Sequence, residues 1–244
     1  MNGSFLKHPI LGLLLLLPLA VLAAEAPVPN LEERISTFEA QREGKGPDAR
    51  SRAVMEQAAR DLAAAMPDPG LKVGSRAPDF TLPDAHGKPV RLADLLQEGP
   101  VIVTFYRGAW CPYCNLQLKA LRESLPHLEA YGARLVAISP QTPDHSRAQV
   151  EKDDYPFHVL SDLDDSVMKA YNLYFELPEE VRALYKGNFD LDIEAYNGEG
   201  RHGLPVPGTF VLDQQGIVRA AFADTDYKKR MEPRVMIEAL EAIQ

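Results

Sequence analysis

The sequence is poor in cysteine, tryptophan and basic residues. Its 244 residues include two cysteines and one tryptophan, and 35 acidic residues outnumber 26 lysines and arginines. A structural zinc site takes about four ligands. Two cysteines are too few for that, and the six histidines are scattered without the spacing of metal ligands. We therefore expect no metal and no cofactor.

The charge balance excludes a second class of function. The formal net charge is −9 at pH 7. Proteins that bind nucleic acid or anionic lipid carry a basic surface that attracts phosphate groups. An acidic chain lacks that attraction, so we expect no nucleic-acid partner.

Long apolar runs are also scarce, and the longest lies near the N-terminus at residues 10–22. Lys7 precedes it and small residues follow it, which is the order found in a secretory signal peptide. The run is short for a bilayer span, so an uncleaved anchor is the less favoured alternative. We expect residues 1–24 to be removed and the protein to be exported, either to a periplasm or as a secreted protein, with no stable membrane insertion after cleavage. Loss of Lys7 would change the net charge from −9 to −10.

The rest of the chain divides into a helical extension and a larger α/β domain. Apolar residues spaced by three and four predict two helices within residues 30–66, and the prolines and glycine of 67–70 end the second. Strand and helix patterns then alternate, which is typical of an α/β fold. The predicted parts are a signal peptide at 1–24, a helical extension with a linker at 25–70, and the α/β domain at 71–244.

Both cysteines lie at a predicted junction between a strand and a helix. Residues 100–104 form an apolar, β-branched strand, and leucines at helical spacing follow Cys114. Cys111 and Cys114 would then lie at the start of a helix, where unpaired N–H groups and the helix dipole favour thiolate over thiol. Two such thiols can close into a disulfide and be reopened by exchange. A purely structural disulfide is the alternative, but so short a loop would constrain the unfolded chain little.

The residues around this pair resemble known redox proteins. The motif Cys-Pro-Tyr-Cys has the form of a glutaredoxin active site, and Trp110 directly before it is typical of thioredoxins. The flanking segments resemble peroxiredoxins of the alkyl hydroperoxide reductase and thiol-specific antioxidant family. The segments that carry this resemblance are 74–82, 87–92, 160–162, 167–171 and 207–213. The resemblance implies a thioredoxin-like fold, with a central mixed β-sheet flanked by helices.

The family resemblance also implies roles for single residues. It places Cys114 at the peroxidatic position and Cys111 where the family has a threonine. Arg107 replaces the proline of the family motif, and the family's activating arginine falls on Pro207, so the usual helpers of the cysteine are absent. Likeness to thioredoxins implies that Pro207 is a cis-proline that faces the pair, and that Val206 offers its backbone to the substrate. The catalytic candidates are Cys114 and Cys111, and the substrate-facing candidates are Trp110, Arg107, Val206 and Pro207.

Three functions remain open at this point. In a thiol peroxidase, the Cys114 thiolate attacks a hydroperoxide, Cys111 resolves the sulfenic acid, and an external dithiol such as a thioredoxin regenerates the pair. In a disulfide oxidoreductase, a more exposed Cys111 attacks a protein disulfide and Cys114 resolves it. In a binding module, the pair is a static bridge. The family resemblance favours the peroxidase. Residues 174–205 form a longer connection than the family usually has, and we expect them to border the cysteines and shape access to them.

Overall fold

The structure is a computed structural model that describes residues 27–44 and 46–244. The predicted signal peptide at 1–24 lies outside the described residues. Among the helices of the described part, none has the length and apolar character needed to cross a membrane.

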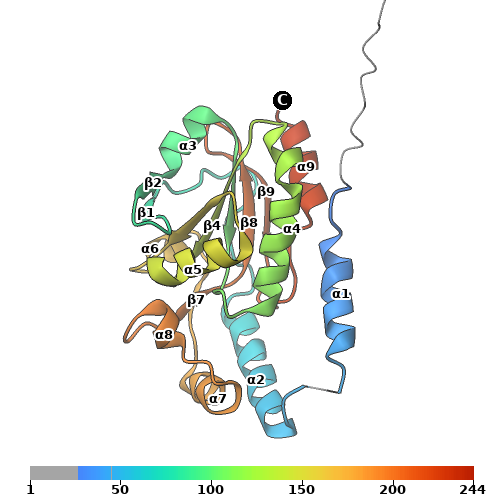
Figure 1. The fold of residues 1–244 in the computed structure, drawn as a ribbon, viewed down its shortest axis with the longest axis vertical. Helices are drawn as coiled ribbons and strands as arrows, with labels where there is room; N and C mark the ends of the chain where they lie inside the picture. The colour runs from blue at the N-terminus through green and yellow to red at the C-terminus, as the bar shows by residue number, and fades with distance from the viewer. Residues whose placement is uncertain (1–26, 45) are drawn as a thin grey trace, which may run out of the picture.

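A five-stranded mixed sheet forms the centre of the molecule (Figure 1). In spatial order its strands are β5 (His158–Ser161), β4 (Arg134–Ser139), β3 (Val101–Phe105), β8 (Gly208–Leu212) and β9 (Val218–Ala223). Strands β3, β4 and β5 are parallel, whereas β8 is antiparallel to β3 and β9 is antiparallel to β8. Every residue of β3 is buried, as its uninterrupted apolar run predicts.

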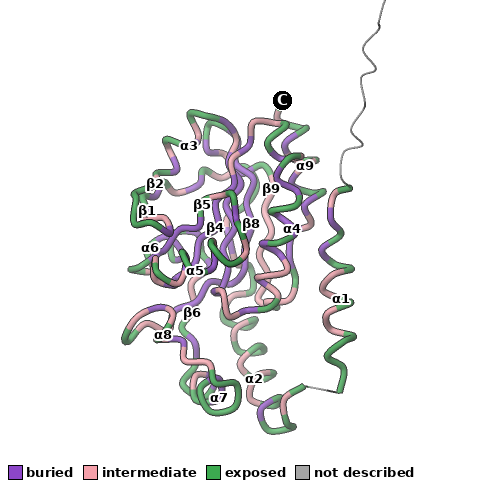
Figure 2. The backbone as a smooth tube through the Cα atoms, in the orientation of Figure 1, coloured by how far each residue is buried: buried purple, intermediate pink, exposed green. Residues whose placement is uncertain are grey.

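Helices cover both faces of this sheet. One face carries α4 (Pro112–Glu129), α5 (Pro143–Asp153) and α9 (Pro233–Glu241), and the other carries α3 (Leu92–Glu98) and α6 (Ser166–Ala170). Because side chains alternate along a strand, Ile102 packs in the cluster of α4 and α9, while Val103 packs in the cluster of α3 and α6. Figure 2 shows the sheet as the most buried part of the chain. The predicted α/β architecture, with a mixed sheet between helices, is confirmed.

Two small hairpins stand outside the central sheet. The first pairs β1 (Thr81–Pro83) with β2 (Pro89–Arg91), and the second pairs β6 (Tyr174–Glu176) with β7 (Gly203–Pro205). The second hairpin encloses α7 (Glu179–Phe189) and α8 (Ile193–Asn197). The long connection at 174–205, called the insertion below, is therefore a folded unit.

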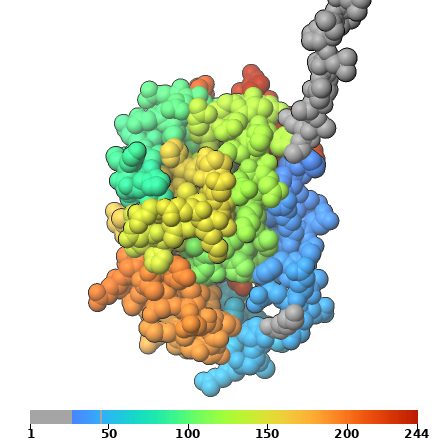
Figure 3. All heavy atoms as spheres, in the orientation of Figure 1, coloured from blue at the N-terminus to red at the C-terminus, as the bar shows by residue number. Residues whose placement is uncertain are grey.

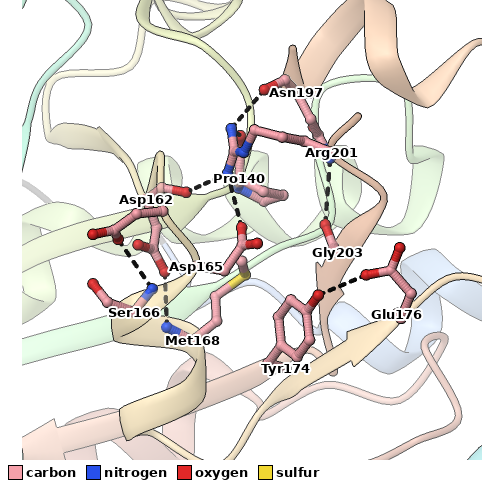
Figure 4. Close-up of polar contacts among 11 residues, drawn as sticks. Pro140, Asp162, Asp165, Ser166, Met168, Tyr174, Glu176, Asn197, Arg201 and Gly203 are labelled. Carbon is pink, nitrogen blue, oxygen red and sulfur yellow. Dashed lines mark hydrogen bonds and ion pairs between the residues drawn. The ribbon is translucent and has the colours of Figure 1, made fainter. Parts of the chain in front are cut away.

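Arg201 fastens the insertion to the central domain (Figure 4). Its guanidinium donates to the backbone oxygens of Pro140 and Asp162, at 2.9 Å and 2.8 Å, and to the carboxylate of Asp165, at 2.8 Å. It also donates to the backbone oxygen of Asn197 within the insertion itself. One side chain thus joins α8 to the loops at the ends of β4 and β5.

Asp162, in the same cluster, caps α6. One carboxylate oxygen accepts the N–H of Met168 at 2.8 Å, as a capping carboxylate does in the first turn of a helix. The residue is fully buried, and burial raises the pKa of its carboxyl group to about 6. A buried acid with a raised pKa makes the stability of this region depend on pH.

The predicted N-terminal extension forms two helices, α1 (Leu31–Gln41) and α2 (Ala49–Ala65). The Glu232 carboxylate accepts the first N–H groups of α1, from Leu31 at 2.9 Å and from Glu32 at 2.7 Å, which is where a helix favours negative charge. Arg34 pairs with Glu123 of α4. Figure 3 shows α1 lying against the green surface of α4, and α2 reaching the orange surface of α7.

Candidate active site

The two cysteines lie at the start of α4, as predicted. Cys111 is the N-cap residue, Pro112 occupies the first turn where a missing N–H costs nothing, and Cys114 follows in the same turn. Both thiols are free and buried, with exposed fractions of 1% for Cys111 and 0% for Cys114. The expectation that Cys111 is the exposed partner is wrong, because both residues lie inside a core cluster against which Trp110 and Tyr113 pack.

The two thiols have opposite pKa shifts. Burial alone would raise the pKa of Cys114, but the hydrogen bond from Cys111, the charge of Arg230, and the backbone N–H and charge of Arg107 outweigh it and lower that pKa to about 5. Burial and the hydrogen bond to Cys114 raise the pKa of Cys111 well above its ordinary value. At neutral pH, Cys114 is therefore a thiolate and Cys111 is the thiol that donates to it.

Arg230 makes the contact that the sequence did not reveal. Its Nη2 atom lies 3.4 Å from the Cys114 sulfur, and its other terminal nitrogen donates to the backbone oxygens of Tyr227 and Lys229. It follows β9, far from the cysteines along the chain, and no motif or spacing marks it. Arg230 and Arg107 thus bring positive charge to Cys114 from positions other than those of the family's usual helpers.

Arg107 lies within a cage of aromatic rings. Its guanidinium carbon is 4.9 Å from the centroid of the Trp110 ring and 4.6 Å from that of Tyr227, so both rings present their faces to the cation. Its Nη2 atom donates to the Tyr185 hydroxyl at 2.8 Å. Since Tyr185 belongs to α7, this contact confirms that the insertion borders the site.

The loop between β3 and α4 has a fixed shape. Gly108 has a φ of +147°, and a Cβ atom there would lie 2.5 Å from the indole nitrogen of Trp110, so the close approach of that ring requires glycine. Gln141 accepts the N–H of Ala109 at 3.0 Å, and Asn115 donates to the Ala109 oxygen at 2.8 Å. These side chains hold the loop that presents Arg107 and Trp110 to the cysteines.

The structure corrects the prediction for Pro207. The Val206–Pro207 bond is trans, so Pro207 is not a cis-proline. The Val206 N–H donates to the Leu173 oxygen at 2.7 Å, so it is already paired and is not offered to a substrate. This bond continues the pairing of the second hairpin and keeps the chain extended between β7 and β8. Val206 and Pro207 instead line a cavity of about 350 Å³, which Arg107 also lines.

Comparison with known proteins places this site in a family. The AhpC/TSA family matches residues 73–221. A putative peroxiredoxin of Mycobacterium tuberculosis (strain H37Rv) is 39% identical over 151 residues, which are 62% of this chain and 84% of that protein. Peroxiredoxin Bcp of Escherichia coli (strain K12) is 36% identical over 106 residues, which are 43% of this chain and 67% of that protein.

Solved structures agree on the fold. The crystal structure of peroxidoxin BcpB from Mycobacterium tuberculosis superposes with a TM-score of 0.57 at 24% identity, covering 71% of this chain and 99% of that one. This likeness confirms the thioredoxin-like fold. The family match includes Cys111, Cys114 and Arg107, whereas α1, α2 and Arg230 lie outside it. On these matches, this chain is a thiol-dependent oxidoreductase that belongs to the AhpC/TSA family.

Proposed function

We propose that the protein is an exported thiol peroxidase that reduces hydroperoxides with Cys114. The observation that carries this proposal is the Cys114 thiolate, with its pKa lowered to about 5 and the Arg230 guanidinium 3.4 Å from its sulfur. A thiolate is the form that attacks an O–O bond, and a guanidinium stabilises the negative charge that develops on the leaving oxygen. The relatives named as peroxiredoxins support the same activity.

The proposed reaction has three steps: attack on the peroxide, resolution by Cys111, and regeneration by an external dithiol. The Cys114 thiolate attacks one oxygen of the hydroperoxide, an S–O bond forms, the O–O bond breaks, and the other oxygen takes up a proton and leaves as an alcohol or water. Cys114 is now a sulfenic acid. The Cys111 sulfur attacks it, the disulfide forms and water leaves. An external dithiol of the thioredoxin type then returns two electrons by thiol–disulfide exchange.

The surrounding residues take different parts in this proposed reaction. Arg230 and Arg107 hold the thiolate and would receive the peroxide oxygens. Trp110 packs against Arg107 and fixes its side chain. Val206 and Pro207 contribute cavity wall on the substrate side. Cys111 supplies the resolving thiol from the adjacent N-cap.

The opposite pKa shifts of the two thiols disfavour the reaction in which Cys111 attacks a protein disulfide. That route needs an exposed thiolate at Cys111, whereas this residue is buried and its pKa is raised. The first nucleophile in this site is Cys114, whichever disulfide or peroxide it meets.

Trp110 provides the test, because it is the one tryptophan and it precedes Cys111. Reduced protein is mixed with hydrogen peroxide while its fluorescence is followed. The wild type should pass quickly to the disulfide. Cys111→Ser should keep the fast first step and accumulate sulfenic acid on Cys114, and Cys114→Ser should abolish the reaction. A slow, saturation-free reaction of the wild type, together with a mixed disulfide trapped by Cys114→Ser, would instead establish disulfide exchange through Cys111.

Export rests on the pattern at residues 1–24. N-terminal sequencing of the protein from its natural source should find a mature start at Ala24 or Glu25. An intact Met1 in a soluble cytosolic fraction contradicts this part of the proposal and leaves the peroxidase chemistry untouched.

A further inference from the structure

The cavity beside Arg107 is built mainly by segments that the thiol chemistry does not use. Helix α2 contributes Met55, Ala58 and Leu62 to its wall, and the insertion contributes Leu177 and Val181. The extension that carries α2 lies outside the part of the chain that matches the family. Part of the cavity wall thus comes from a helix that the family match does not include.

The size of the cavity suits a small organic ligand. Its volume is about 350 Å³, within the range of roughly 300–1,000 Å³ that ligand sites occupy. Its walls are almost wholly apolar side chains. Such a space favours a hydrocarbon group, because burying one methylene changes a binding equilibrium about fourfold.

Charged side chains occur at two places in the wall. Arg107 is buried, with an exposed fraction of 4%, and its backbone N–H and its charge act on Cys114. Asp61 and Glu176 are both exposed and line the same cavity from α2 and β6. A ligand that enters from solvent therefore passes two carboxylates before it reaches apolar walls and a single cation.

We propose that this cavity binds the hydrocarbon part of a bulky, uncharged hydroperoxide and so selects the substrate of Cys114, a proposal that rests on the proposed peroxidase function. The hydrocarbon lies between α2 and α7, and the peroxide group lies against Arg107. Neither cysteine lines the cavity; Arg107 connects the two, because it lines the cavity and its charge acts on Cys114. The acidic rim disfavours a hydroperoxide of the same length that carries a carboxylate.

The experiment compares three oxidants on the reduced protein. They are hydrogen peroxide, the hydroperoxide of methyl linoleate, which is uncharged, and the hydroperoxide of linoleic acid, which is anionic. Second-order rate constants are measured from the Trp110 fluorescence. The uncharged ester should react at least about tenfold faster than hydrogen peroxide, as the burial of a few methylenes allows, and faster than the acid.

A substitution that fills the cavity tests this assignment, and the same substitution outside the cavity is its control. Ala58→Phe places a ring in the space, whereas Ala64→Phe adds the same ring to an exposed position of α2 that does not line the cavity. Ala58→Phe should slow the ester at least about tenfold, from the loss of buried methylene contacts, and leave hydrogen peroxide within about twofold of the wild type. Ala64→Phe should change neither rate. If Ala58→Phe fails to fold, Ala58→Leu makes the same comparison with a smaller side chain.

The outcomes separate this proposal from the one on which it rests. Equal slowing of all oxidants by Ala58→Phe, equal rates of ester and hydrogen peroxide in the wild type, or a faster anionic acid would each overturn the cavity's assignment while leaving the peroxidase intact. A wild type that reacts with hydrogen peroxide and the ester no faster than an ordinary low-pKa thiol contradicts the peroxidase itself. Binding of the unreactive alcohol of methyl linoleate, weakened by Ala58→Phe and not by Ala64→Phe, supports the assignment without any chemistry at Cys114.

Discussion

Two regions of the molecule meet at the active site, and they differ in how far apart their residues lie along the chain. The junction of β3 and α4 supplies Arg107, Trp110 and both cysteines within a few residues. The segments that close over it supply Tyr185 from α7 and Arg230 from the loop before α9. The junction positions the nucleophile and supplies the Cys111 hydrogen bond and the Arg107 charge that lower its pKa, and the closing segments add the charge of Arg230. Within the junction, the helix N-terminus, Cys111 and Arg107 favour the thiolate. The closing segments add a further cation and help to bury the pair, and burial by itself favours the thiol.

The sharpest way to break this comparison is to remove Arg230. Arg230→Met takes away a charge and a hydrogen bond that lower the pKa of Cys114, so that pKa should rise. A hydrogen bond to a charged group contributes about 1.5–3 kcal/mol, which corresponds to about 1–2 pKa units, so the peroxide reaction near pH 6 should slow roughly twofold to fifteenfold as the thiolate fraction falls. The pKa is read from thiolate absorbance near 240 nm during a pH titration.

The control for this variant is Lys229→Met, which removes a neighbouring exposed cation that pairs with Asp224. It should leave the titration of Cys114 where it is. If Arg230→Met also leaves the midpoint near 5, then the helix start and Arg107 are sufficient, and the closing segments do not determine the charge state.

Asp162→Asn tests the buried carboxyl group that caps α6. In the folded protein the pKa of Asp162 is raised by burial to about 6, above an ordinary value of 3.8. The folded state therefore binds a proton more tightly than the unfolded state, so this group's contribution to stability is largest below pH 4 and is lost as pH rises to 6. The free energy of unfolding of the wild type should fall by about 2 kcal/mol across that range relative to the variant.

Urea unfolding at pH 4 and at pH 6.5 measures this difference. Asp164→Asn is the matched control, since hydrogen bonds from Ser166 lower the pKa of that exposed acid. A wild type and an Asp162→Asn variant with parallel pH profiles would show that the buried carboxyl group has no raised pKa.

Tyr185→Phe tests the contact between Arg107 of the junction and α7 of the closing segments. It removes the hydroxyl that accepts from Arg107 and keeps the ring that packs on Trp110 at 6.0 Å. A hydrogen bond to a neutral partner contributes about 1 kcal/mol, so the rate of the peroxide reaction should change about threefold to tenfold. The pH profile of this rate should also shift, because Arg107 acts on Cys114. Tyr196→Phe, on α8 beside His145, should leave the profile unchanged. Identical profiles for both variants would mean that Arg107 needs no anchor from the insertion.

The smallest effect is expected where α1 touches both regions. Glu39 accepts from Lys228 at 2.8 Å, in the closing loop, and from Tyr113 at 3.2 Å, in the junction. Exposed ion pairs contribute about 0.5 kcal/mol, so Glu39→Gln should lower Tm by only about 1–3 °C. Glu33→Gln on the exposed side of α1 is the control. A loss of peroxide reactivity in Glu39→Gln would show that α1 is part of the site and does more than anchor the loop.

The sequence by itself determined the order of the elements and the place of the nucleophile. Apolar runs and leucine spacing depend on neighbouring residues, so the buried strand β3, the helix that starts at the cysteines and the two helices of the extension could all be predicted locally. The flanking segments also sufficed to identify the family, because they are motifs of short span.

Only the tertiary structure decided which groups from distant segments surround that nucleophile. Arg230 reaches Cys114 from 116 residues away, and Tyr185 reaches Arg107 from within the insertion, through packing that no local pattern encodes. The same packing buries both thiols, pairs the Val206 N–H and leaves Pro207 in a trans bond. A pKa depends on the burial and charge that surround a group in space, so the division of the pair into a thiolate and a thiol appears only when the chain is folded.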